Sequence, residues 1–168
     1  MEAHVTRPSS KDVSIRPLRE GDYPAADVLL CELHRLHAEA RPDLYRPAMH
    51  PYSGEEFRYL VADAETLSLA AEVGGHFAGL CIAMLRLSSK SPAMVPERIA
   101  YVEDLCVHPD FRRAGVGRLL FERVEDLARE RGAKRLELMV WSFNRDAALF
   151  YERLGMTPQR FILEKPLI

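Results

Sequence analysis

The chain has 168 residues, a length that fits one ordinary domain able to bury roughly 70% of its unfolded surface. Its 23 basic and 25 acidic residues give no overall positive field, which excludes a protein that holds nucleic acid through net charge. No apolar run approaches the roughly 18 residues of a membrane span. Three cysteines, Cys31, Cys81 and Cys106, match neither a zinc knuckle nor a redox pair. We therefore expect a cytoplasmic protein without a nucleic-acid or membrane partner.

The first third of the chain predicts a leader, a strand and two helices. Residues 1–12 lack the hydrophobic core of a signal peptide and are predicted to be a disordered leader. A strand follows at 13–18, and apolar residues at helical spacing predict a helix over 23–40. The proline-rich, aromatic segment 41–57 predicts a loop leading into a second helix near 54–63. Because this segment is predicted to be accessible, we expect it to form part of a substrate wall.

The rest of the chain alternates strand and helix patterns. Two β-runs surround the hairpin dipeptide Gly74-Gly75, and a further strand carries two acids, Glu103 and Asp104, in its middle. A helix with one apolar stripe follows at 116–131. After it come a strand at 133–141, a short helix at 142–155 and a last strand at 159–167. This order predicts an α/β fold with a mixed, mainly antiparallel sheet. We see no repeat or linker, so 13–168 is predicted to be a single domain.

The glycine-rich stretch before the long helix is compared with two known phosphate loops. A Walker loop needs Lys and Ser or Thr directly after its last glycine, where Arg118 and Leu119 stand. A dinucleotide-binding loop needs glycine or alanine at the position of Leu120. Both loops are excluded, and what remains is the pattern Arg-x-x-Gly-x-Gly from Arg112 to Gly117.

The physical chemistry of this pattern suits a pyrophosphate. Backbone N–H groups around residues 113–117 stand unpaired at a helix N-terminus and favour an anion. Glycine lets the backbone approach that anion closely because it has no Cβ. Three arginines are placed to add charge beside a phosphate, namely Arg112, Arg113 and Arg118. Taken alone, two glycines before a helix also fit an ordinary tight turn.

Three segments together resemble the GNAT family of N-acetyltransferases, which moves acetyl from acetyl-CoA to an amine. They are the loop just described, "LCVHP" at 105–109 and "NRDAALFYERLG" at 144–155. The resemblance spans about 101–155 and implies a GNAT-like sheet flanked by helices, with strands splayed at the cofactor site. The acidic pair is also similar to the diamine and polyamine acetyltransferase branch. Arg113 departs from the glycine or lysine common in the family, and we expect its side chain to point outward.

The resemblance also implies roles for individual residues. Glu103 is the expected base, acting through water, with Asp104 as the second candidate, and Tyr151 is the expected acid that protonates the CoA thiolate. A backbone N–H from 105–107 is the expected oxyanion donor. The residues expected to bind acetyl-CoA are Leu105, Cys106, Val107, Arg112, Arg113, Ala114, Gly115, Val116, Gly117, Arg118, Asn144 and Ala147.

The implied activity is acetyl transfer from acetyl-CoA, as co-substrate, to a primary amine by direct attack in a ternary complex. Acids near the site favour a small cationic amine, while a protein or peptide amine and a non-catalytic acyl-CoA-binding module stay as alternatives. Cys106 fits a small core residue better than an acyl-cysteine, because no histidine is placed to activate it. His34 and His37 have no acidic or cysteine partner in the sequence pattern, so no metal is expected. A homodimer is compatible with the resemblance.

Overall fold

The computed structural model describes residues 12–47 and 49–167. Apart from Asp12, the predicted leader 1–12 lies outside the described residues. The chain divides into two compact units, one ending at Leu138 and the other beginning at Met139. The single-domain boundaries 13–168 stay a prediction. No helix in the described part combines the length and the apolar composition needed to cross a membrane.

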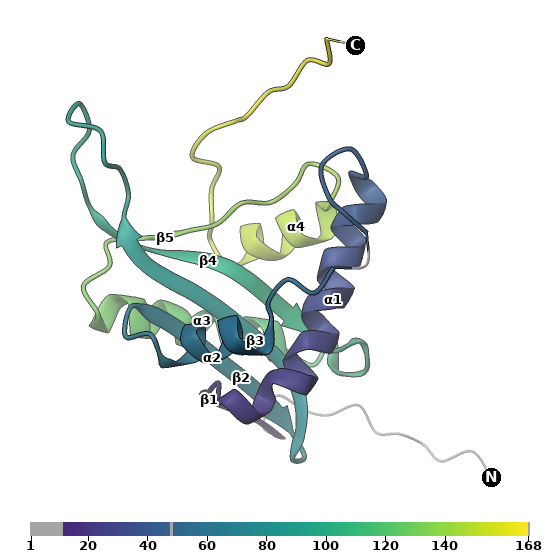
Figure 1. The fold of residues 1–168 in the computed structure, drawn as a ribbon. Helices are drawn as coiled ribbons and strands as arrows, with labels where there is room; N and C mark the ends of the chain where they lie inside the picture. Colours follow the sequence, from purple (N-terminus) through teal and green to yellow (C-terminus); the bar gives the residue numbers. More distant parts are fainter. Residues whose placement is uncertain (1–11, 48, 168) are drawn as a thin grey trace. The chain divides into compact units, whose positions relative to one another are not determined.

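The first unit is built on a five-stranded sheet in the order β1-β2-β3-β4-β5 (Figure 1). Strands β1 to β4 pair with one another in antiparallel fashion, and the short β5 runs parallel to β4. The strands are β1 (Val13–Pro17), β2 (Thr66–Val73), β3 (His76–Leu87), β4 (Arg98–Val107) and β5 (Leu136–Glu137). The predicted mixed, mainly antiparallel sheet of an α/β fold is confirmed.

Helices cover both faces of this sheet. One face carries α1 (Tyr23–Ala40) and α2 (Gly54–Ala62), and α3 (Val116–Glu130) lies on the other (Figure 1). Phe57 of α2 and the leucines of α1 are buried with Leu80 and Ile82 of β3. The apolar stripe of α3 is buried at the spacing that the sequence predicts, at Val116, Leu120, Phe121, Val124 and Ala128. Each fully buried large side chain of this kind contributes about 1.5–3 kcal/mol, so packing of these stripes holds the helices on the sheet.

The pairing of β3 with β4 contains a β-bulge at the acidic pair. Asp104 lies opposite Ile82, and Val102 lies opposite the next residue, Ala83. Glu103 is therefore the extra residue on β4, without an opposite residue on β3. A bulge of this kind bends the strand and redirects side chains, so the simple alternation of faces does not hold at this point.

Two predicted strands differ from the structure. The strand expected over 133–141 is reduced to Leu136–Glu137, and the one expected over 159–167 was wrong, because residues 156–167 lie in neither helix nor strand. Phe161, Ile162 and Leu163 are more than 80% exposed. An alternating apolar pattern forms a strand only where a sheet edge accepts its backbone groups. Within the described residues, no strand pairs with this segment.

Candidate active site

The bulge brings the two acids of β4 to the same face of the sheet. Asp104 shares its face with Ile82, because directly opposed residues of antiparallel strands point the same way. This is the face covered by α1 and α2, and here the hydroxyl of Tyr52 donates a hydrogen bond to Asp104 Oδ2 at 2.8 Å. Regular alternation would have put Asp104 on the face opposite Glu103, so the bulge decides that the carboxylates are neighbours.

Glu103 is the more accessible member of the pair. Its carboxylate lies 3.8 Å from Nη1 of Arg86, and 34% of its side chain is exposed. The Arg86 guanidinium stacks over the ring of Tyr101, 3.8 Å from the ring centroid. An exposed ion pair of this kind contributes about 1 kcal/mol at most. The Glu103 carboxylate is therefore open to solvent and to a molecule arriving from it.

The electrostatics of the pair follow from partial burial. Desolvation raises the pKa of the Asp104 carboxyl above its ordinary value, and the neighbouring charge of Glu103 acts in the same direction. The hydrogen bond from Tyr52 opposes this shift, because it stabilises the carboxylate. Burial and the charge of Asp104 raise the pKa of Tyr52 as well, which keeps its hydroxyl protonated as a donor. The site thus concentrates negative charge beside a neutral phenol.

Replacing Asp104 by Asn should flatten the dependence of stability on pH. A carboxyl with a raised pKa in the folded state keeps its proton after the unfolded chain has lost it. The free energy of unfolding of the wild type should therefore fall as pH rises from about 3.8 through the raised folded pKa. Asp104→Asn should lack this contribution, since Asn Oδ1 still accepts the Tyr52 hydrogen bond. Urea unfolding at a series of pH values between about 4 and 7 measures the difference.

The matched control is Asp110→Asn, which removes a carboxylate whose side chain is 81% exposed. Its unfolding profile should follow that of the wild type more closely than the profile of Asp104→Asn does. If Asp104→Asn and wild type lose stability equally across this pH range, Asp104 does not titrate as the geometry indicates.

Beyond the acids, one edge of β4 has backbone groups that the sheet does not use. The pairing of β4 with β5 covers only Ala100 and Tyr101, as expected for strands that splay. The N–H of His108 donates to Ala78 O at 2.9 Å, so the antiparallel ladder directs the N–H of Cys106 toward β3 as well. The N–H groups of Leu105 and Val107 then point to the opposite edge. Of the three predicted oxyanion donors, only Cys106 has its N–H directed into the sheet, and the role of Leu105 and Val107 stays a prediction.

The glycine loop begins after the short 3-10 helix η3 (Pro109–Phe111) and runs into α3. Gly115, the residue before α3, has φ 84°, and Arg113 has φ 67°, both in the left-handed region that favours glycine. Arg113 is exposed, as expected, and its backbone conformation explains why glycine suits this position. Within the described chain, the N–H groups of residues 113–118 have no backbone acceptor. They form a cradle of the kind that suits a phosphate group.

Two of the three arginines around this loop already have partners. Arg112 donates from Nε to the carbonyl of Val107 at 3.0 Å and from Nη2 to Glu32 Oε1 of α1 at 2.7 Å. It therefore ties the loop to the end of β4 and to α1. Arg118 pairs with Glu122 one turn along α3, at 3.1 Å. The predicted phosphate contacts of Arg112 and Arg118 require these exposed side chains to share or change partners.

The second unit contains α4 (Arg145–Arg153) and three predicted site residues. Asn144 caps this helix, because its Oδ1 accepts a hydrogen bond from the N–H of Ala147 at 3.1 Å. Tyr151 is half-buried in the last turn, with its ring edge-on to Phe150 at 5.1 Å between centroids. Asn144, the N-cap, and the helical residues Ala147 and Tyr151 are thus spaced three and four positions apart, and their part in acetyl-CoA binding and acid catalysis stays a prediction.

Several residues have contacts that the sequence does not reveal. Cys106 is buried, which raises the pKa of its thiol well above the ordinary value and supports a core role. His34 Nε2 lies 2.7 Å from the carbonyl of Arg46, and the ring of His37 stacks on Tyr45. Both histidines therefore hold the loop after α1. Tyr52 was missed as a site residue, and its aromatic side chain in the predicted substrate wall was the only signal for it.

Comparison with known proteins identifies the family of the chain. The sequence profile of the acetyltransferase (GNAT) family matches residues 30–156. The chain belongs to this family. The match includes the acidic strand, the glycine loop and the helix that carries Tyr151.

Individual relatives give more detail. The chain is 40% identical over 52 residues to a thialysine N-epsilon-acetyltransferase of Caenorhabditis elegans, over 31% of this chain and 32% of that protein. It is 31% identical over 102 residues to the Bos taurus enzyme of the same name, over 61% of this chain and 58% of that protein. The chain thus aligns with less than two thirds of either relative. A crystal structure of a mutant of the protein BH1408 from Bacillus halodurans is 28% identical, with a TM-score of 0.87 over 92% of this chain and 99% of that chain.

Proposed function

We propose that the protein is an enzyme that transfers acetyl from acetyl-CoA to the primary amine of a small cationic molecule. The observation that carries this proposal is the acidic pair Glu103–Asp104, held on a bulge in the middle of the strand that leads into the glycine loop. Family membership supports the donor, and the names of the thialysine acetyltransferases support an amine acceptor with a side chain like that of lysine.

The loop supports the donor end of the reaction. The N–H groups of residues 113–118 and the positive end of the α3 dipole offer a seat for the pyrophosphate of acetyl-CoA. The outward N–H groups of Leu105 and Val107 bind the pantetheine arm as a neighbouring strand would, and one of them donates to the thioester oxygen as negative charge develops there. Asn144 and Ala147 complete the pantetheine contacts in this proposal.

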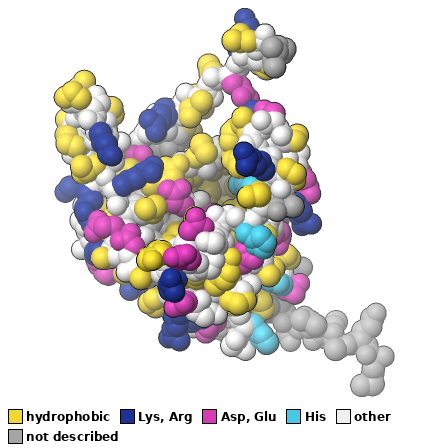
Figure 2. Space-filling view, in the orientation of Figure 1, with side chains coloured by type: hydrophobic (Ala, Val, Ile, Leu, Met, Phe, Trp, Pro, Cys, Tyr) yellow, Lys and Arg dark blue, Asp and Glu magenta, His cyan; other side chains and the backbone are white. Residues whose placement is uncertain are grey.

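The acids support the acceptor end. An alkylamine with a pKa of about 10.4 is protonated at neutral pH and must lose a proton before it attacks the thioester. Glu103, the more accessible acid, receives that proton through an ordered water, and Asp104 with Tyr52 adds the negative environment that attracts the cation. Acidic side chains also gather over α2 on the face shown in Figure 2, where Glu55 and Glu56 are exposed. Tyr151 then protonates the departing thiolate.

A thiol-release assay tests the proposal. Purified protein is incubated with acetyl-CoA and one member of a panel of polyamines, lysine-like amino acids, aminoglycosides and peptides. Release of CoA thiol above the amine-free background is expected with small amines that carry a second positive charge, because the acidic pair attracts them. Release with peptides alone would replace the small-amine acceptor by a protein amine. Acetyl-CoA binding without release for any amine would indicate a non-catalytic acyl-CoA-binding module.

A further inference from the structure

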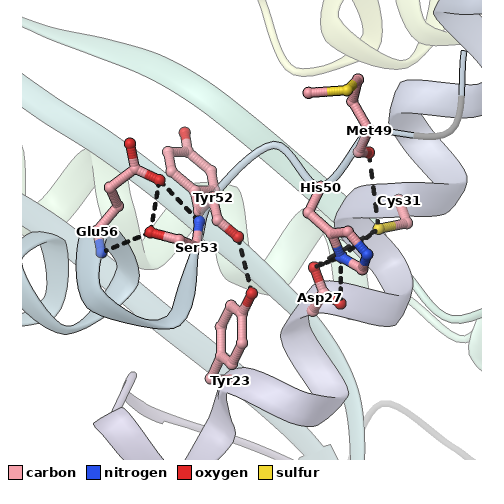
Figure 3. Close-up of polar contacts among 8 residues, drawn as sticks. All are labelled: Tyr23, Asp27, Cys31, Met49, His50, Tyr52, Ser53 and Glu56. Atoms are coloured by element: carbon pink, nitrogen blue, oxygen red, sulfur yellow. Dashed lines mark hydrogen bonds and ion pairs between the residues drawn. The ribbon is translucent and has the colours of Figure 1, made fainter.

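A cluster of three side chains outside the proposed active site has the chemistry of a metal site. Asp27 and Cys31 lie one turn apart on α1, and His50 lies in the loop that connects α1 with α2. Figure 3 shows the imidazole of His50 turned toward both residues. The nitrogen Nδ1 lies 2.9 Å from Asp27 Oδ1 and 3.5 Å from Cys31 Sγ, and Sγ lies 3.5 Å from Asp27 Oδ1. Three different donor atoms therefore converge on one point.

These separations match those around a tetrahedral zinc ion. Zinc bonds of about 2.3 Å to sulfur and about 2.0–2.2 Å to nitrogen or oxygen hold the donors about 3.3–3.6 Å apart. The two distances to sulfur already have this value, and the distance from nitrogen to oxygen needs to open by about 0.4 Å. A mixed sulfur, nitrogen and oxygen donor set suits zinc among the divalent cations.

The same geometry argues against a nucleophilic triad. A cysteine activated by histidine needs one ring nitrogen as its base, while the aspartate holds the other nitrogen. Here Asp27 and Cys31 both approach Nδ1 of His50. Convergence on a single nitrogen is the arrangement of ligands around an ion rather than of a proton relay.

We propose that Asp27, Cys31 and His50 bind one zinc ion that fastens the loop after α1 to the helix. On binding, the Cys31 thiol releases its proton to solvent and the thiolate sulfur binds the ion. The imidazole binds through Nδ1 and keeps its proton on Nε2. The carbonyl oxygen of Met49, 4.0 Å from Sγ, or a water fills the fourth position. The side chain of His50 is 66% exposed, so the site is open to a metal from solvent.

The position of this site gives the ion a structural consequence. His50 lies two residues before Tyr52, whose hydroxyl bonds Asp104 and whose carbonyl accepts a hydrogen bond from Tyr23 at 2.8 Å (Figure 3). The next residue, Ser53, caps α2 and shares a capping box with Glu56. An ion bound to His50 therefore fixes the start of the segment 50–53. Within this segment, Tyr52 contacts Asp104 of the acidic pair. This inference goes beyond the proposed function, whose chemistry needs no metal.

The test uses the full chain after treatment with a chelator. Co²⁺ is titrated as a spectroscopic probe, and Zn²⁺ affinity is measured by competition with a chromophoric chelator. We expect one equivalent of Co²⁺ with a thiolate-to-cobalt charge-transfer band, displaced by Zn²⁺. Cys31→Ser should abolish the band, and Cys31→Ser and His50→Ala should each weaken Zn²⁺ binding at least about 100-fold, since loss of a residue that only hydrogen-bonds a metal ligand already costs about 10–100-fold.

The matched control is His76→Ala, which removes an exposed histidine from the hairpin between β2 and β3. It should bind both metals as the wild type does. Far-UV circular dichroism of each metal-free variant checks that the fold is kept. A band that persists in Cys31→Ser, wild-type affinity in His50→Ala, or absence of a thiolate band in the wild type at saturating Co²⁺ overturns the proposal.

Discussion

Gly117→Glu should abolish binding of CoA while leaving the fold intact. Gly117 is the second residue of α3, in the turn whose N–H groups are expected to face the pyrophosphate. A glutamate there places a like charge and five additional side-chain heavy atoms, three carbons and two oxygens, against that anion. Like charges forced together cost several kcal/mol, which corresponds to a loss of affinity of roughly a thousandfold or more. Isothermal titration with CoA measures the change.

The stability of this variant separates loss of binding from loss of fold. Glu has a better helix propensity than Gly by up to about 1 kcal/mol, and a negative charge in the first turn interacts favourably with the helix dipole. The melting temperature of Gly117→Glu should therefore equal or exceed that of the wild type. Gly21→Glu is the matched control, because a Cβ added at Gly21 meets no atom within 4 Å. Normal CoA affinity in a folded Gly117→Glu variant would remove the loop from the cofactor site.

Tyr151→Phe should lower kcat by about one to three powers of ten, the usual size of general acid catalysis. The substitution removes only the hydroxyl, so the half-buried ring keeps its edge-on contact with Phe150. Without the phenol, the CoA thiolate must leave unprotonated or take its proton from water. The affinity for acetyl-CoA should stay nearly unchanged, since the hydroxyl is needed in the transition state. Steady-state kinetics and direct titration together provide this comparison.

Tyr59→Phe is the matched control for this experiment. Tyr59 lies on α2 and is 63% exposed, so its hydroxyl can be removed without loss of packing. Its turnover should match that of the wild type. A single-turnover measurement checks that the chemical step, rather than product release, limits turnover. If that holds and both Tyr151→Phe and Tyr59→Phe turn over at the wild-type rate, another group protonates the thiolate.

Whether both acids face the acceptor depends on the register of β4. A regular strand would turn Glu103 and Asp104 to opposite faces, and only one of them would meet the acceptor. The bulge between Val102 and Asp104 places both on the face of α1 and α2, where Tyr52 joins them. This grouping is a reason to expect a cationic acceptor, and it also explains why two candidate bases are found where one is needed.

Local patterns were sufficient for the elements that depend on near neighbours. The apolar stripe of α3 and the glycine loop before it were predicted within a residue or two, because helix periodicity and a positive φ are properties of a short segment. The same reasoning was wrong for residues 159–167. A strand pattern there has no described partner, and strand formation depends on a second segment distant in sequence.

The sequence by itself determined the mixed α/β fold, the membership of the acetyltransferase family and the loop expected to hold acetyl-CoA. These follow from periodicity and from motifs whose residues are close together in the chain. Only the tertiary structure decided that Glu103 and Asp104 share a face, that Tyr52 bonds Asp104, and that Asp27, Cys31 and His50 meet at one point. These arrangements depend on strand register and on the path of a loop, which are fixed by contacts between residues that lie 19 to 52 positions apart.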